Sequence, residues 1–185
     1  MKGLNEMTKR IVIDAGHGGK DPGAVNNSKH EAIAALAIAK KVGTLLKDKG
    51  YSVKYTRSTD KYLSLSERCK ISNQFDADAF ISIHLNAAAN KEASGIETWR
   101  YANVGDTTRT LAKEVQTELI AATGARDRGV KTSTTFYVLK HTKAPAVLVE
   151  AGFISNNEEA KLLFASKYQS KIANAIVKGV EKTFS

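Results

Sequence analysis

Three short apolar runs, each followed by an ionisable side chain or by a turn that carries one, constrain the fold of this chain most strongly. The runs are Ile11-Val12-Ile13, Phe80-Ile81-Ser82-Ile83 and Ala146-Val147-Leu148-Val149. Continuous apolar runs are typical of strands covered on both faces, as in a parallel sheet, whereas strands covered on one face alternate. Runs rich in β-branched and aromatic residues predict further strands at 51–56, 96–101 and 136–139.

Helical patterns lie between these runs. Apolar side chains recur at helical spacing from residue 31 until just before Gly50, and Ser64-Leu65-Ser66-Glu67 is a capping-box pattern that opens a helix ending near Phe75. Two more helices are indicated by the apolar sets Leu111, Val115, Leu119 and Ile172, Ile176, Val180. This alternation predicts an α/β fold, a three-layer sandwich with a mostly parallel, twisted sheet of about six strands and helices on both faces.

The composition is that of one soluble globular domain. The chain has 185 residues, of which 42% are hydrophobic and 25% charged, enough to form a core of its own. We expect a short N-terminal extension, residues 1–8, followed by a single domain, residues 9–185. No uncharged stretch approaches the roughly 20 apolar residues of a membrane span, so no membrane insertion is expected. The first ten residues hold no apolar core, so we expect no export signal within the chain.

The charge balance favours an anionic partner. Lys and Arg number 28 and Asp and Glu 19, a formal charge of +9. Nucleic acid, a membrane surface and an anionic wall polymer all satisfy that sign. The glycine-rich turn at 16–19 does not fit a nucleotide loop, because Asp21 stands where either phosphate motif requires Gly, Ser or Thr.

The polar residues that follow the three runs form a candidate site. His17 lies in the turn after the first run, His84 ends the second and Glu150 ends the third. The carboxyl ends of neighbouring parallel strands meet at one edge of a sheet, so we expect these side chains to converge. Glu31 opens the first long helix at the same edge, where the helix dipole also favours a carboxylate.

These residue types suit a catalytic zinc site. Such a site has three protein ligands, drawn from histidine and carboxylate, and leaves a position for water, whose pKa falls towards about 7. A carboxylate outside the coordination sphere can take the proton and pass it to a leaving amine. This chemistry fits His17, Glu31 and His84 as ligands and Glu150 as catalytic base and acid, although the residues alone do not fix Glu31. The residues alone leave open ordinary structural roles, such as a core histidine or a surface charge at a helix start.

Several other polar residues are candidates for supporting roles. Asn86, close to His84, and His141, in a basic loop, are candidate substrate contacts. His30 is a candidate metal ligand or a partner of one. We expect three further residues, Arg57, Asp60 and Arg68, to form an ion pair or network that holds a loop in place.

Five segments together carry a family resemblance. In order along the chain they are IVIDAGHGGKDPGA, FISIHLNAA, GIETW, DRGVK and AVLVEAGFISN. They resemble the zinc-dependent N-acetylmuramoyl-L-alanine amidases of the amidase-3 type, which include bacterial autolysins and phage endolysins. The resemblance implies cleavage of the amide between N-acetylmuramic acid and the L-alanine of the peptidoglycan stem peptide. It also implies one zinc held by His17, Glu31 and His84, with Glu150 catalytic.

The resemblance also sets the expected partners. Peptidoglycan is the expected substrate, anionic cell-wall polymers are attracted by charge, and the expected place of action is outside the cell, at the wall. We expect a monomer that binds no nucleic acid. Two alternatives stay open: a different metallohydrolase, such as a peptidase or nuclease, since fold does not fix chemistry, and a non-catalytic wall-binding module. A nuclease with two metals would need clustered carboxylates that the motifs lack.

Overall fold

A six-stranded sheet forms the centre of the computed structural model, which describes residues 8–185. The strands of this sheet, in spatial order, are β4 (Ser52–Tyr55), β1 (Arg10–Ala15), β5 (Ala79–Asn86), β8 (Ala146–Phe153), β6 (Ile96–Tyr101) and β7 (Asp127–Ser133). A two-stranded hairpin, β2 (Val25–Asn26) and β3 (Lys29–His30), leads into the first helix. The helices are α1 (Glu31–Asp48), α2 (Leu65–Phe75), α3 (Asp106–Thr123), α4 (Tyr137–His141), α5 (Asn157–Leu163) and α6 (Ser166–Phe184).

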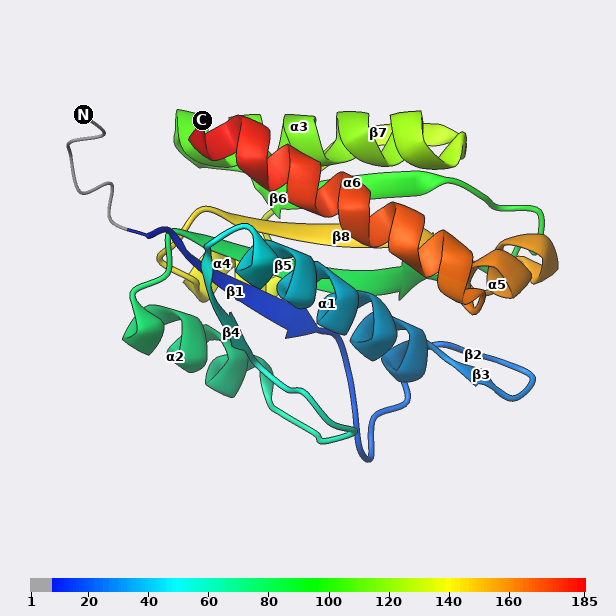
Figure 1. Ribbon diagram of the computed structural model, residues 1–185. Helices are drawn as coiled ribbons and strands as arrows, with labels where there is room; N and C mark the ends of the chain where they lie inside the picture. Colours follow the sequence, from blue (N-terminus) through cyan, green and yellow to red (C-terminus); the bar gives the residue numbers. More distant parts are fainter. Residues whose placement is uncertain (1–7) are drawn as a thin grey trace.

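Helices cover both faces of the sheet and make the predicted three layers (Figure 1). The larger core lies under α1, α3, α5 and α6, where side chains such as Ile38, Leu111 and Ile176 are fully buried against the strands. A smaller core lies under α2 and α4 and contains Phe80 and Leu148. The predicted α/β sandwich is therefore confirmed.

The strand directions bring the candidate residues to one edge. β4, β1, β5 and β8 are parallel neighbours, whereas β6 runs antiparallel to β8 and pairs in parallel with β7. The carboxyl ends of β1, β5 and β8 therefore meet the amino end of β6 at the same edge. β5 and β8 both continue past the expected ends, to Asn86 and Phe153, so His84 and Glu150 lie within paired strands rather than at their tips.

The strand predicted at 136–139 is wrong, because this segment forms most of the short helix α4. The Ser133 hydroxyl oxygen accepts hydrogen bonds from the backbone N–H groups of Thr135 and Phe136, and these bonds turn the chain at the end of β7. The turn then lets the adjacent residues Val138 and Leu139 both be buried, which one face of a strand does not allow. Strand propensity is overridden here by the turn and by packing.

Within residues 8–185, no helix combines the length and the apolar character that crossing a membrane requires.

Candidate metal centre and active site

The turn that carries His17 is held by a buried polar network. The Asp14 carboxylate is fully buried and accepts hydrogen bonds from Thr56, Ser82 and Arg68, at 2.6, 2.6 and 2.8 Å. Burial alone would raise the pKa of Asp14, but Arg68 and the two hydroxyl donors outweigh it and lower the pKa. Asp14 therefore stays charged and fixes Arg68 beneath the turn.

Two arginines then bind the backbone of that turn. Arg68 donates to the carbonyl oxygens of Ala15 and His17, and Arg57 donates to those of Ala15 and Gly16. These bonds hold His17 in the left-handed region, at φ 58°, which is strained for a residue with a side chain. The ion pairs expected among Arg57, Asp60 and Arg68 are not formed. Arg68 pairs with Asp14, and Asp60 accepts the N–H of Gly19, so each residue holds the turn through other partners.

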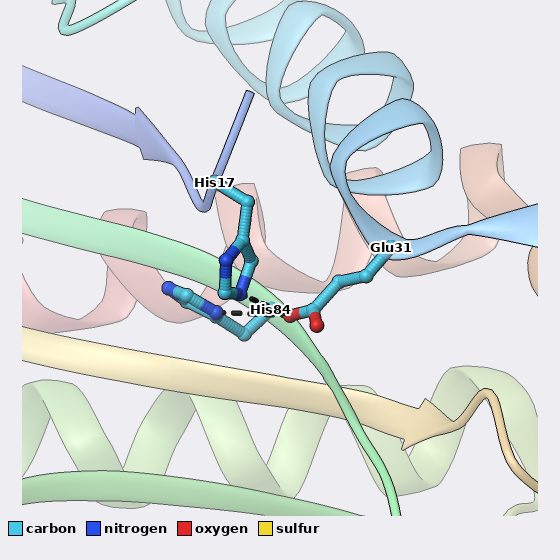
Figure 2. Close-up of side chains that lie close together, drawn as sticks. All are labelled: His17, Glu31 and His84. Carbon is cyan, nitrogen blue, oxygen red and sulfur yellow. Dashed lines mark hydrogen bonds and ion pairs between the residues drawn. The ribbon is translucent and has the colours of Figure 1, made fainter. Parts of the chain in front are cut away.

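His17, Glu31 and His84 converge on one point (Figure 2). His17 comes from the turn after β1, Glu31 from the first residue of α1 and His84 from β5. Glu31 Oε1 lies 3.2 Å from His17 Nε2 and 3.0 Å from His84 Nδ1, and one ligand atom from each residue lies within 4.8 Å of the others. Two ligands of a tetrahedral zinc lie about 3.3 Å apart, so this spacing fits a metal. Among the described residues, no other group of three or more His, Cys, Asp or Glu side chains lies close enough together to hold a metal ion.

The cluster has one open side. Glu31 keeps only 5% of its side-chain surface exposed, whereas His17 and His84 keep 25% and 20%. The Glu31 carboxylate also accepts hydrogen bonds from the backbone N–H groups of Leu85 and Ala24, and these bonds fix its position. A ligand can therefore reach the cluster from solvent, while the carboxylate stays in place.

Two glycines make room for the cluster. A Cβ atom on Gly16 would collide with the His84 ring. A Cβ on Gly23 would lie 2.7 Å from Glu31 Oε2, and Gly23 also has φ +67°, which favours glycine. Neither position can therefore carry a side chain, because its Cβ atom would collide with a candidate metal ligand.

The electrostatics of the cluster favour a cation. Burial by itself would lower the pKa of His17, but hydrogen bonds and charge interactions with Glu31 and Asp21 raise it to about 9. Burial opposes ionisation of Glu31, yet His17 and His84 outweigh this effect and hold its pKa far below the usual range. The site thus holds positive charge beside Glu31, and a metal ion can replace that proton.

Asp21 is a supporting residue that the sequence did not predict. Its Oδ2 lies 2.8 Å from His17 Nδ1, on the side of the ring away from Glu31. A carboxylate on the second ring nitrogen orients a metal-binding histidine and makes it a better ligand. His30, by contrast, precedes α1 as its N-cap residue and does not belong to the cluster.

Glu150 lies beside the cluster in β8, paired in register with His84 of β5. Its Oε2 is buried and has no hydrogen-bond partner among the described residues. Burial raises the pKa of Glu150 to about 7; His84 opposes this rise, and the negative charges of Glu31 and Glu97 add to it. A buried carboxyl with a free oxygen and a pKa near neutrality is suited to accept and release a proton.

A second group, missed by the sequence analysis, lies on the other side of Glu150. Glu97, in β6, is paired in register with Glu150 and is 4% exposed. It accepts hydrogen bonds from Asn86 Nδ2 at 3.0 Å, Trp99 Nε1 at 3.0 Å and Arg128 Nε at 2.7 Å. These donors satisfy its charge, so Glu97 is a fixed anion. The available signal was an acidic residue within the strand of the GIETW segment.

A cleft of about 460 Å³ opens from the candidate site between α2 and α4. His17, His84 and Glu150 line it, together with apolar side chains. Asn86 and His141 do not belong to the lining. Asn86 bonds Glu97 and its own loop, and the His141 ring packs on Tyr137, 4.1 Å between centroids. The substrate contacts predicted for these two residues stay predictions.

Comparisons with known proteins agree with this geometry. A family profile described as N-acetylmuramoyl-L-alanine amidase matches residues 11–182. The N-acetylmuramoyl-L-alanine amidase LytC of Bacillus subtilis is 42% identical over 91% of this chain and 34% of its own length. The sporulation-specific N-acetylmuramoyl-L-alanine amidase of the same species is 37% identical over 95% of this chain and 68% of its own length.

A solved structure supports the same assignment. The crystal structure of N-acetylmuramoyl-L-alanine amidase from Clostridium difficile 630 superposes with a TM-score of 0.92 and 36% identity, covering 96% of this chain and 97% of that one. Profile, sequence and structure therefore agree over nearly the whole chain, and the chain belongs to the N-acetylmuramoyl-L-alanine amidase family of enzymes.

Proposed function

We propose that the chain is a zinc-dependent hydrolase of the amide between N-acetylmuramic acid and L-alanine in peptidoglycan. The observation that carries the proposal is the convergence of His17, Glu31 and His84 with Glu150 on the adjacent strand. Family membership supplies the amidase activity, and the donor set supports the metal. Two imidazoles and one carboxylate, with one side open, are the donors of a catalytic zinc.

His17, Glu31 and His84 would hold the zinc, which when bound supplies Lewis acidity and makes water acidic near neutral pH. Asp21 orients the His17 ring, and the backbone donors of Leu85 and Ala24 orient Glu31. The protein thus presents its three ligands without rearrangement of the turn or of α1.

Glu150 acts as the proton carrier. In the metal-free protein burial raises the pKa of Glu150 to about 7, so both the carboxylate and the acid are accessible to this side chain. The carboxylate can take a proton from the attacking water, and the resulting acid can donate it to the alanine nitrogen as the amide breaks. Its unpartnered Oε2 leaves one oxygen available for this transfer.

Wall digestion tests the proposal. The purified protein should release new N-terminal alanine from peptidoglycan, lose this activity to a strong chelator and regain it with zinc. Glu150→Gln should bind zinc normally and lose activity by about 100- to 10,000-fold, whereas Glu92→Gln, at an exposed position, should be unaffected. Digestion at the wild-type rate by Glu150→Gln would contradict the assigned role. Wall binding without amide cleavage would instead identify a binding module.

The place of action and the remaining partners belong to the same proposal. We expect the protein to act at the cell wall, as a monomer, with its charge of +9 attracting anionic wall polymers rather than nucleic acid. Binding to walls stripped of anionic polymers should be weaker, and salt should reduce binding to intact walls. Equal binding to both preparations would contradict the charge argument.

A further inference from the structure

The cleft beside the catalytic residues has an unusually apolar and aromatic wall. Large hydrophobic side chains that are exposed among the described residues number seven, and three of them line this cleft: Tyr62, Leu65 and Tyr137, at 41, 53 and 38% exposure. Leu63, Phe136, Val138 and Leu148 line it as well. Exposed apolar side chains gathered at one place mark a binding surface rather than scattered surface residues.

The two tyrosine rings are held in place. The Tyr137 ring packs on His141, with centroids 4.1 Å apart and an angle of 31° between the planes. The Lys20 ammonium lies 4.5 Å from the centroid of the Tyr62 ring. Tyr62 comes from the loop before α2 and Tyr137 from the start of α4, so two separate segments supply the rings that line the cleft. Fixed rings lose little conformational freedom when a ligand binds.

The charges near the cleft distinguish the two halves of the substrate. Apart from the buried Asp14–Arg68 pair, the charged residues lining the cleft besides the two histidines are Asp21 and Glu150, both acidic. The stem peptide of peptidoglycan carries carboxylates, which acidic residues repel. The cation on the far side of Glu150 is Arg128, which is 29% exposed and bonds Glu97. Lys20, on the Tyr62 ring, adds a cation at the rim of the cleft. Within the lining, a peptide carboxylate meets Asp21 and Glu150, so it is favoured towards Arg128 or the rim and disfavoured inside the cleft.

We propose that the cleft between α2 and α4 takes the N-acetylmuramoyl sugar, with its ring against Tyr62 and Tyr137. The proposal rests on the proposed function, because the scissile amide must lie between the candidate zinc site and Glu150, and His17, His84 and Glu150 all line the cleft. A pyranose has one apolar C–H face, which suits the electron-rich face of a tyrosine ring. A volume of about 460 Å³ is in the range of pockets for ligands of this size.

The experiment uses two substrates that share the scissile amide: an N-acetylmuramoyl peptide and a lactoyl-L-alanyl peptide that lacks the sugar ring. For the wild-type protein, the sugar should lower KM. Tyr137→Ala should raise KM for the muramoyl substrate about 3- to 10-fold, the effect of one aromatic contact, and leave the lactoyl substrate unchanged. Leu162→Ala, exposed but outside the cleft, is the matched control and should leave both substrates unchanged.

A binding measurement separates this proposal from the proposed function. Metal-free protein is titrated with the N-acetylglucosaminyl–N-acetylmuramic acid disaccharide, its lactyl carboxyl blocked as the methylamide so that it carries no charge, and followed by NMR. Tyr62 and Tyr137 signals should shift, and Tyr137→Ala should weaken binding 3- to 10-fold. Equal losses on both substrates, or disaccharide binding unchanged by Tyr137→Ala, would overturn the sugar assignment while leaving the amidase proposal intact. Absence of cleavage of either substrate, with disaccharide binding as expected, would overturn the amidase proposal alone.

Discussion

Removing the charge of Glu150 should raise the unfolding free energy of the metal-free protein, and it should abolish the activity of the zinc-loaded protein. Burial raises the pKa of Glu150 from an ordinary 4.5 to about 7. Ionising this carboxyl in the folded state therefore lowers the unfolding free energy by about 3 kcal/mol. Because the folded state binds this proton more tightly than the unfolded state, stability falls as pH rises from about 4.5 to about 7. The full destabilisation is present above pH 7 and absent below pH 4.5.

Glu150→Gln keeps the shape of the side chain and removes the ionisable group. At pH 8 the metal-free variant should therefore exceed the wild type in unfolding free energy by up to about 3 kcal/mol, or about 6–12 °C in Tm for a chain of this length. At pH 4.5 the two proteins should unfold together. The comparison between two proteins cancels the titrating groups that do not interact with Glu150. His84, Glu31, Glu97 and His17 do interact with it, and their coupling is part of the measured difference.

The assay is chemical denaturation of both proteins at pH 4.5, 6 and 8, after exhaustive chelation. Glu92→Gln, on an exposed loop, is the control and should change stability by less than about 0.5 kcal/mol at every pH. If Glu150→Gln is no more stable than the wild type at pH 8, the ionised Glu150 does not lower the unfolding free energy and the reasoning is refuted. A gain of the same size at pH 4.5 and pH 8 would refute the electrostatic explanation and point to packing.

Three further predictions test the support of the site. Arg68→Met breaks a buried ion pair and should lower the unfolding free energy by about 3–5 kcal/mol in denaturant titrations, whereas Arg109→Met, in an exposed pair, should cost at most about 1 kcal/mol. Gly16→Ala should displace the histidine of β5 and weaken zinc binding more than about tenfold in dialysis with metal analysis, while Gly105→Ala, with open space around it, should not. Asp21→Asn should weaken zinc binding about 10- to 100-fold in competition with a chromogenic chelator.

The main elements of the fold could be predicted from sequence because their burial is simple. β1, β5 and β8 are covered on both faces, and their runs are continuously apolar. β7 (Asp127–Ser133) carried no such signal, because it is an edge strand whose residues are exposed or half-buried up to its last residue, Ser133. The helix α4 was hidden by strand-forming residues, because the turn at Ser133 decides its conformation. Periodicity reports burial, and it cannot predict segments whose conformation depends on local hydrogen bonds between a side chain and the backbone.

The site itself was predictable to the extent that parallel strands present their carboxyl ends together. That rule placed His17, His84 and Glu150 at one edge, and the structure brings them together there. Glu31 is different, because its role depends on the path of the β2–β3 hairpin, which no pattern in the sequence predicted. The resemblance to a family, rather than the residue pattern, carried that assignment.

Glu97 escaped the same rule because its strand runs the other way. β6 is antiparallel to β8, so its amino end, not its carboxyl end, reaches the edge with the candidate site. Glu97, the second residue of the strand, therefore lies beside Glu150. The direction of β6 therefore has a chemical consequence. It places a fully bonded carboxylate next to an unbonded one, and that fixed negative charge adds to burial in raising the pKa of Glu150 towards neutrality. A parallel β6 would present its other end, with Tyr101, at this edge and leave burial to act with Glu31 alone.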